Sequence, residues 1–464
     1  MSLAINTNVS SLTAQNNLKK NNRDLMTSLK RLSTGLKING GADNPAGLIA
    51  SENLRLEKSG IEAGLRNAER AGTMIATAEG GLAEVSNLLN ELQGLVNETA
   101  NSGGLSDEEI EANQLQVDGI LNTINRLAQS VNFQGKKLLN GNYDYTTSGA
   151  NLSSFTDVQI DSARLVDGKA KTVVADITAV ASQGLVEVNV SGGFAAAYTI
   201  EVAGTKGTEQ LSFLSGASAA DIVAAVNAVT GVTGVEATTS GNDIDFQSEK
   251  FGSDEFVSIK TISGTFANGN DSGADATVTI NGAAAEVDGL DVTYRSSGLD
   301  VSFSIIEAAN TAATKTFSIT KGGAQFSLGS SVNETEKASL GIASVSTGSL
   351  GIAGSYLSTL GTGGSNSLSS TSLNKAQEII EGAVKQVSET RGRLGAFQKF
   401  VVNSTVNQLG VAYENASAAE SAIRDTDFAV ETAALTRAQI MAQASTSVLA
   451  QANQQPQLAL QLLG

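Results

Sequence analysis

The chain has 464 residues, a formal net charge of −17, and no His, Cys or Trp. Without Cys there is no disulfide, thiolate nucleophile or zinc–thiolate site, and without His the commonest general base and metal ligand is missing. The acidic balance argues against nucleic-acid binding, which needs a basic face. The composition therefore disfavours an enzyme. Absence of Cys suits an exported protein, although many cytosolic proteins also have few.

The charge is unevenly distributed along the chain. Residues 151–350 hold 23 acidic and 10 basic residues, whereas residues 1–45 hold six basic and two acidic ones and residues 420–464 hold two basic and four acidic ones. The opposite signs of the two ends favour their pairing, although exposed ion pairs are individually weak. No signal peptide is visible, and no run of about 18 apolar residues predicts a membrane span.

The first 40 residues carry a heptad pattern of leucines: Leu18, Leu25, Leu29, Leu32 and Leu36. This spacing predicts one helix with an apolar seam. A turn signal at residues 39–41 ends it. Asn44 can then cap a second helix, and Pro45 suits the first helical position because its missing N–H is not needed there.

The second predicted helix covers about residues 45–100. Its apolar residues form two rows spaced by seven: Ile61, Ala68, Ile75, Leu82, Leu89 and Val96, and beside them Ala71, Ala78, Val85 and Leu92. A repeat of this length predicts packing against other helices, with Gly80 and Gly81 as a weak point. Ser106 and Glu109 form a capping box that predicts the start of a third helix.

Residues 373–464 also have a helical pattern. The row Ile380, Val387, Leu394 and Val401 is followed, one residue out of step, by Val402, Leu409, Ala416, Ile423 and Val430. We attribute this drift to the mismatch between a straight helix and a seven-residue repeat. Leu435 and Ile440 continue the apolar pattern towards the C-terminus.

The middle of the chain alternates apolar and polar residues and contains frequent turn signals. Strands are predicted at residues 185–190, 198–202, 243–246, 256–259 and 277–280, with a short helix at 221–229 capped by Ser218. The expected fold class is α+β: a long, discontinuous helical coiled-coil or bundle stalk built from both termini, with a β-rich outer domain inserted in the middle.

Motifs that could carry chemistry are weak. Neither Gly-Lys step, at Gly135 and Gly168, has the surroundings of a phosphate loop. Asp243 with Asp245, or Asp425 with Asp427, could contact a hard cation, but neither pair continues into a calcium loop. We interpret the first pair as strand positions and the second as a helix start, where acids are favoured. No catalytic residue, metal site or cofactor is predicted.

The terminal heptads lack enough partners within one chain. The rows of the second, third and penultimate helices can close an ordinary monomeric bundle. Residues 1–39 and 423–464 would form only a thin hairpin, so neighbouring subunits must cover some of their apolar side chains. The predicted subunit-packing residues are Leu18, Leu25, Leu29, Leu32, Leu36, Ile423, Val430, Leu435 and Ile440.

Six segments resemble motifs of bacterial flagellins and occur in that family's order: residues 5–8, 29–39, 42–48, 133–139, 421–427 and 451–453. The resemblance covers about residues 1–140 and 373–464. It implies a structural subunit, secreted through the flagellar type III apparatus, that self-assembles into the extracellular flagellar filament for motility. Its implied partners are further copies of itself in a helical homopolymer, an export chaperone, and the filament cap and hook-junction proteins.

The resemblance also implies a domain organisation. Residues 1–45 and 420–464 would form the inner-tube terminal helical domain. Residues 46–175 and 336–419 would form a helical rod domain with β-hairpins, and residues 176–335 a surface-exposed, β-rich variable domain. Within the last, residues 198–263 resemble a small β–α–β insertion module found in flagellins.

Many flagellins are sensed by a Toll-like receptor, an innate immune receptor, through the long helix. The matching segment here is Leu89, Asn90, Glu91, Leu92, Gln93, Gly94 and Leu95. Glu91 stands where the family's key Arg is expected, and Gly94 where a Glu is expected. Replacing a guanidinium by a carboxylate reverses the charge. The departure predicts that this subunit is a poor agonist.

The sequence bears on three other functions. A hook–filament junction protein would share the terminal helices but would not form the bulk of the fibre. A metallopeptidase carried in the variable region is excluded, because a chain without His has no His-Glu-x-x-His zinc site. The middle domain could act as an adhesin for neutral glycans. Neither nucleic acid nor membrane is an expected partner.

Overall fold

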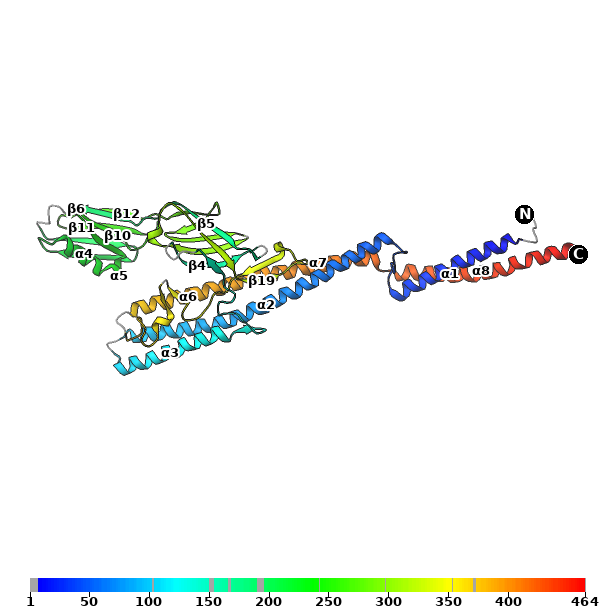
Figure 1. Ribbon diagram of the computed structural model, residues 1–464, viewed down its shortest axis with the longest axis horizontal. Coiled ribbons are helices and arrows are strands. Elements are labelled where there is room, and N and C mark those ends of the chain that lie inside the picture. The colour runs from blue at the N-terminus through cyan, green and yellow to red at the C-terminus, as the bar shows by residue number, and fades with distance from the viewer. Residues whose placement is uncertain are drawn as a thin grey trace. The chain divides into compact units, whose positions relative to one another are not determined.

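The computed structural model describes residues 7–101, 104–149, 154–165, 168–189, 196–241, 243–296, 298–352, 354–369 and 373–463, with side chains up to residue 455. The chain forms two compact units. The first comprises residues up to 70, residues 327–336 and residues from 402 onward, so the two ends of the chain belong to the same unit (Figure 1). The second comprises residues 71–326 and 337–401.

The helices are α1 (Val9–Thr34), α2 (Pro45–Thr99), α3 (Asp107–Ser130), α4 (Ala219–Ala228), α5 (Thr230–Thr233), α6 (Leu373–Ala396), α7 (Asn403–Arg424) and α8 (Phe428–Leu463). Short 3-10 turns are η2 (Glu307–Ala309), η3 (Glu334–Glu336) and η4 (Leu357–Leu360), and a π-helical turn, η5 (Phe397–Val402), joins α6 to α7. Among the described residues, none of these helices has the length and apolarity for a membrane span.

The predicted helix starts are confirmed. Asn44 Oδ1 accepts a hydrogen bond from Gly47 N at 2.9 Å, and α2 begins at the next residue, Pro45. Ser106 and Glu109 form the full capping box of α3, each side chain accepting from the other's backbone N–H. These bonds satisfy backbone donors that have no partner inside the helix.

Both predicted apolar rows of α2 are buried along their whole length, from Ile61 to Val96. The helix also runs without interruption through Gly80 and Gly81. A Cβ on Gly81 would lie 2.8 Å from Val131 Cγ2 and from Leu139 Cδ1. Glycine is therefore used here for close packing, and the helix does not break.

The π-helical turn η5 corrects our interpretation of the C-terminal repeat. Val387 and Leu394 are buried before the turn, and Val402 and Leu409 after it, so the buried row moves by one residue within η5. A π-turn is a one-residue insertion that widens a single helical turn. The drift therefore has a local cause and does not arise from gradual mismatch with a straight helix.

Two sheets of the second unit share one apolar core. The five-stranded sheet has the order β14-β13-β5-β18-β3, and the four-stranded sheet the order β15-β16-β17-β4. Phe155 packs edge-on against Phe303 and Phe317, with ring centroids 4.7 and 5.7 Å away. The strands are β3 (Thr146–Ser148), β4 (Phe155–Ala163), β5 (Lys171–Ala179), β13 (Thr277–Ile280), β14 (Ala283–Ala284), β15 (Glu286–Asp288), β16 (Asp291–Ser296), β17 (Leu299–Ile305) and β18 (Thr314–Lys321).

A second β module has its own core. Its sheets have the orders β6-β10-β9 and β12-β11-β7-β8, and Ile222 and Val226 of α4 pack into the core with Phe246. Its strands are β6 (Leu185–Asn189), β7 (Tyr198–Gly204), β8 (Gly207–Phe213), β9 (Val235–Ser240), β10 (Asp243–Ser248), β11 (Phe256–Ser263) and β12 (Gly269–Ser272). Ser218 caps α4 as predicted.

The described residues also form three two-stranded sheets: β1 (Asn132–Phe133) with β2 (Lys136–Lys137), β19 (Ala324–Ser327) with β20 (Lys337–Leu340), and β21 (Gly351–Ile352) with β22 (Ser355–Tyr356). Gln134 and Gly135, both with positive φ, form the turn of the first. Each of the five predicted strands is present, although Val190, the last residue of the first prediction, lies outside the described residues. Helices from both ends of the chain and a β-rich middle confirm the expected α+β class.

Candidate assembly surface

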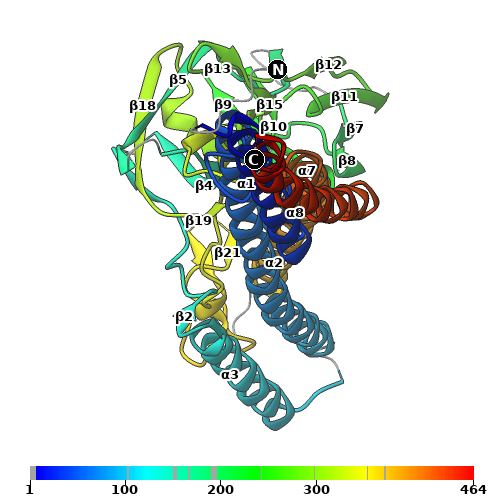
Figure 2. The same ribbon diagram turned by 90° about the vertical axis from the view of Figure 1, so that its right-hand side faces the viewer.

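Helices α1 and α8 pair antiparallel in the first unit, and the two views show them side by side (Figures 1 and 2). Asn8 Nδ2 donates to Ala452 O at 2.8 Å, and Asn21 Nδ2 donates to Ser445 Oγ at 2.6 Å. The predicted pairing of the two ends is therefore built largely from side-chain amides and hydroxyls.

The loops beside this pair are also joined. Lys37 N donates to Arg424 O at 2.7 Å, and Thr426 N donates to Gly35 O at 2.9 Å. Asp427, one of the acidic residues considered for cation binding, accepts from Ala429 N at 2.8 Å. It caps the start of α8, which confirms the predicted role of this acid at a helix start.

The contact between α1 and α8 buries small or polar side chains. In α1 the buried residues are Ser11, Ala14 and Ser28. In the described part of α8, Ala438 and Ala452 are buried, and Glu431 is buried 3.7 Å from Arg31. Because burying Ala or Ser removes little apolar area from water, this contact alone stabilises the pair only slightly.

Nine other large apolar side chains of these two helices are exposed: Val9, Leu12, Met26 and Leu29 on α1, and Phe428, Val430, Ile440, Met441 and Val448 on α8. Leu18, Leu25 and Leu32 of α1 and Leu435 of α8 are half-buried. At 100° per residue, Val430, Met441 and Val448 fall within about 20° of one another around α8. They lie on one side of the helix, whereas Phe428 lies about 160° around it from Val430. We call the nine exposed residues the outer apolar face; so many large exposed apolar side chains on one helix pair indicate an interaction site.

The nine predicted packing residues divide into two groups. Leu18, Leu25, Leu32, Leu36, Ile423 and Leu435 are half-buried. Leu29, Val430 and Ile440 belong to the outer apolar face, with exposed fractions of 44%, 65% and 61%. Heptad reasoning missed the other six members of that face because they lie outside the a and d positions. The sequence feature that could have identified these six residues is their large apolar side chains at positions where a solvated helix surface should be polar.

Helices α2 and α7 pack next to this region, within the same unit. Ile61, Leu409 and Ala416 form a small apolar core. Beside it, Lys58 Nζ lies 2.9 Å from Glu420 Oε2, and the hydrogen bond with this carboxylate raises the Lys58 pKa.

Residues 327–336 pack closely against α2. A Cβ on Gly64 would lie 2.7 Å from the carbonyl oxygen of Gly329. Glu336 Oε2 accepts from Ser331 N at 2.8 Å and so fixes this loop. The segment returning from the β-rich region is thereby held on the helix by contacts that only a glycine at position 64 permits.

The segment that resembles the family's receptor-recognition segment, residues 89–95, lies on α2. Leu89, Leu92 and Leu95 are buried in the helical core, and Gln93 is half-buried. Asn90, Glu91 and Gly94 are exposed. A Cβ on Gly94 would meet no atom within 4 Å. Glu91 and Gly94, the two positions at which a departure from the family motif is predicted, are therefore surface positions.

No cation site emerges from the described residues, among which no three His, Cys, Asp or Glu side chains converge. Asp243 and Asp245 lie on β10, as predicted for strand positions, and Asp243 Oδ1 accepts from Asn189 Nδ2 at 2.6 Å. Asp425, interpreted with Asp427 as a helix start, is instead the C-cap that ends α7, and its Oδ2 accepts from Ser421 Oγ at 2.6 Å. The candidate acids thus serve local structure.

Comparison with protein families gives three matches. The model of the bacterial flagellin N-terminal helical region matches residues 5–144, that of the C-terminal helical region matches residues 377–463, and the flagellin hook IN motif matches residues 199–249. The last range falls within the second β module, where the sequence resembled an insertion module.

Curated relatives match over the full chain. Flagellin D of Vibrio cholerae serotype O1 is 30% identical over 470 residues, and the B-type flagellin of Pseudomonas aeruginosa is 30% identical over 549, each alignment covering 100% of both chains. The solved structure of FliC from Burkholderia pseudomallei is 14% identical, with a TM-score of 0.25 over 71% of this chain and 99% of that chain. A TM-score this low supports no inference about this chain. On the family models and the full-length relatives, the chain belongs to the bacterial flagellins and is a structural subunit of the flagellar filament.

Proposed function

We propose that this flagellin polymerises through the outer apolar face of α1 and α8, which docks against the same helices of neighbouring copies. The supporting observation is the distribution of side chains in this pair. Small residues such as Ala14 and Ala438 face inward, whereas large ones such as Val430 and Ile440 face solvent. A pair built this way gains most of its apolar burial from other subunits.

We also propose that these helices become stably ordered only on assembly. A two-helix pair that fully buries only Ser, Ala and one ion pair, and half-buries a few leucines, offsets little of the entropy of ordering its backbone. Isolated helices are marginal in water, and most helical stability comes from tertiary packing. Folding and polymerisation of residues 1–45 and 420–464 would then be one coupled step, with large burial of apolar surface.

The contact between subunits is heterologous in this proposal. A self-complementary contact closes into a dimer, whereas two different surfaces meeting head to tail generate an open helical filament. Residues 1–45 and 420–464 would line the inner tube, residues 46–175 and 336–419 would form the surrounding rod layer, and residues 176–335 would project outward. The net acidity of the middle of the chain supports a solvated outer surface there.

The proposal extends to export. The subunit would leave the cell through the flagellar type III apparatus, escorted by a chaperone on its C-terminal region, and would be placed beneath a filament cap on a base of hook-junction proteins. The filament would then be extracellular. Family membership and the absence of Cys from the whole sequence support this route.

We further propose that this flagellin is a poor agonist of the Toll-like receptor. Glu91 is exposed on α2 where the family presents an Arg, and Gly94 offers no carboxylate. A receptor surface that pairs with the family's guanidinium would meet a like charge here. A reporter assay giving full potency would contradict this proposal.

Charge introduced at half-buried positions of α1 tests the proposal that ordering of the terminal helices and assembly are coupled. Leu25→Asp or Leu32→Asp should block filament growth from seeds, because a carboxylate cannot be buried there without a partner. Leu214→Asp is the matched control, since Leu214 is 82% exposed outside the terminal helices. Circular dichroism should show that α2, α3 and α6 remain folded. Normal filaments from both terminal variants would refute the proposal, and failure of the unmodified chain to grow would favour a junction protein.

A further inference from the structure

Glu431 is the one charged residue that is buried, among those whose side chains the structure describes; only 7% of its surface is exposed. It lies in the first turn of α8 and is the only acidic residue of that 36-residue helix. The helix dipole favours an acid in a first turn, but it does so at the surface as well. The dipole therefore does not explain why this carboxylate is buried against α1.

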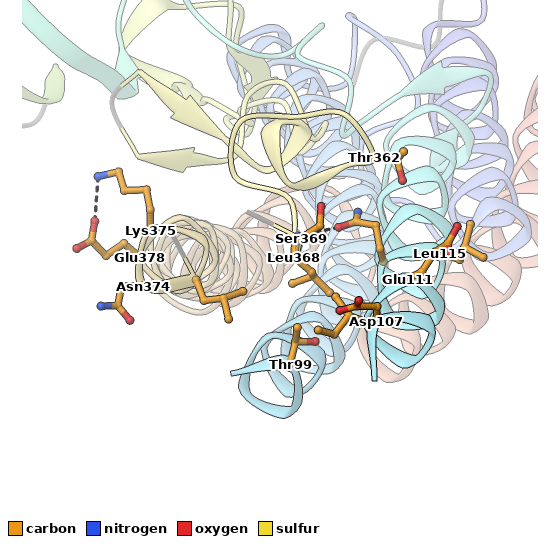
Figure 3. A pocket seen from close by; sticks show the side chains of 13 residues that line it. Thr99, Asp107, Glu111, Leu115, Thr362, Leu368, Ser369, Asn374, Lys375 and Glu378 are labelled. Carbon is orange, nitrogen blue, oxygen red and sulfur yellow. Dashed lines mark hydrogen bonds and ion pairs between the residues drawn. The ribbon is translucent and has the colours of Figure 1, made fainter. Parts of the chain in front are cut away.

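The partner of Glu431 is Arg31, near the end of α1. Arg31 Nη1 lies 3.7 Å from Glu431 Oε2, and the two side chains are 29% and 9% exposed. Arg31 Nε and Glu431 Oε1 are buried without a hydrogen bond. By contrast, the ion pair between Lys375 and Glu378 in Figure 3 joins side chains that are 44% and 59% exposed. Desolvation of a buried pair can exceed the attraction within it, so such a pair adds little stability; its best-attested role is to specify register.

The apolar contact between α1 and α8 leaves their register open. Each helix presents a row of buried or half-buried residues spaced by seven: Ser11, Leu18, Leu25 and Leu32 on α1, and Glu431, Ala438, Ser445 and Ala452 on α8. A slide of one helix past the other by seven residues, about 10 Å, brings the two rows together again. Packing of small residues and leucines therefore does not by itself distinguish the native pairing from a slipped one.

The charges remove this degeneracy. A slide of up to seven residues keeps the same face of α1 opposite Glu431 only at spacings of three, four or seven from Arg31. Within α1 these positions hold no cation: Asp24, Thr27, Ser28 and Thr34. Asp24, one heptad away, would bring two carboxylates together, and the other three would leave Glu431 without an opposite charge. Within one heptad, only the native register joins the single acid of α8 to a guanidinium.

Hydrogen bonds along the helix pair occur in this same register. Asn8 Nδ2 donates to Ala452 O at 2.8 Å, and Asn21 Nδ2 donates to Met441 O at 3.2 Å. The intervals between these contacts and the ion pair on α1 match those on α8 to within about half a turn. A side-chain amide can find another backbone carbonyl after a slide, because every turn of a helix presents one. The ion pair has no such substitute.

We propose that the Arg31–Glu431 ion pair sets the register in which α1 and α8 pair, so that every subunit offers its neighbours the same outer apolar face. A slip by one heptad would displace Val430 and Ile440 by about 10 Å relative to α1, and neighbouring copies would no longer bury them. The inference rests on the proposed polymerisation through α1 and α8 and adds the residue pair that selects its geometry.

Charge reversal tests the proposal in the full-length chain. Arg31→Glu and Glu431→Arg, each alone, place like charges in the contact and should raise the critical concentration for seeded growth by about 100-fold or more. Arg31→Glu combined with Glu431→Arg restores opposite charges and should return that concentration to within about tenfold of the unmodified chain. The helix dipole predicts no such recovery, because the double variant still carries a cation at the start of α8.

Lys30→Glu combined with Glu431→Arg is the matched control, with the same net charge as the double reversal. Lys30 precedes Arg31 in the chain and is exposed, so a carboxylate at this position lies outside the contact. The critical concentration of this control should stay as high as that of Glu431→Arg alone.

Introduced cysteines report the register directly, because the chain has none of its own. Asn21→Cys with Ser445→Cys replaces side chains whose Nδ2 and Oγ atoms lie 2.6 Å apart. In filaments treated with a short bis-maleimide, this pair should give an intrachain cross-link, seen as a shifted monomer band on a denaturing gel. With Arg31→Glu added, and subunits supplied above the raised critical concentration, fewer chains should carry the cross-link.

Single reversals that assemble like the unmodified chain, a double reversal no better than Glu431→Arg alone, recovery by the Lys30→Glu control, or an equal cross-link yield with and without Arg31→Glu would overturn the inference while leaving assembly through α1 and α8 intact. If the unmodified chain fails to extend seeds, it is the proposed polymerisation itself that fails.

Discussion

Truncation of Ile440 measures how much the outer apolar face contributes to assembly. Its side chain is 61% exposed in the single chain. Burying a whole Ile side chain contributes about 1.5–3 kcal/mol, so burying the exposed part contributes about 1–2 kcal/mol per subunit. Ile440→Ala removes most of this gain and should raise the critical concentration by about 5- to 30-fold.

The assay is the concentration of soluble subunit that remains at equilibrium with filaments. Leu214→Ala is the matched control, because Leu214 is exposed outside the terminal helices and should leave that concentration unchanged. A critical concentration for Ile440→Ala equal to that of the unmodified chain would refute the claim that this face is buried in the filament. An equal shift in the control would mean that the effect is not specific to α8.

The other predictions concern the receptor, packing and pH. Glu91→Arg with Gly94→Glu should raise potency in a Toll-like receptor reporter assay, and no gain would show that these positions do not limit recognition. Gly64→Ala should lower the free energy of unfolding by about 1–3 kcal/mol, because its Cβ would lie 2.7 Å from a carbonyl oxygen. The measurement is a shift of the urea midpoint to lower concentration. Gly80→Ala, with open space around the Cβ, should instead add up to about 1 kcal/mol. Hydrogen bonds from the side chain and backbone of Ser253 and from Gly289 N hold the pKa of Asp275 below its usual value. The stability it contributes is therefore present above the unfolded pKa of about 3.9 and is lost as pH falls through the folded pKa. Between pH 5 and pH 3, about the range of that transition, the melting temperature of Asp275→Asn should fall less than that of the unmodified chain. Equal falls would contradict this role of Asp275.

The helical core could be predicted because its sequence signal is strict. Every member of the two rows from Ile61 to Val96 is both apolar and buried, and the caps at Asn44 and Ser106 use residues whose hydrogen bonding is local. The alternating strands of the β modules were found for the same reason. Local chemistry and periodic burial agree in these elements, and such agreement makes a fold readable from its sequence.

Features that depend on one inserted residue or on side-chain size were not predictable in the same way. The shift from Leu394 to Val402 resembled gradual drift, although a π-turn produces it. Heptad leucines indicated a seam in α1; Leu18, Leu25 and Leu32 are half-buried in the same seven-residue row as Ser11, which is fully buried. Leu29 is exposed. A heptad row shows that a helix has an apolar side; it does not show whether that side meets its own chain or another one.

Seeded polymerisation of the purified chain, viewed by negative-stain electron microscopy beside a version lacking residues 1–45 and 420–464, tests the central claim most directly. The account predicts that the intact chain extends seeds into filaments. The trimmed chain should remain soluble while its circular dichroism still reports the helices and sheets of the second unit. Filaments from the trimmed chain, or an intact chain that stays soluble with active seeds, would contradict assembly through α1 and α8.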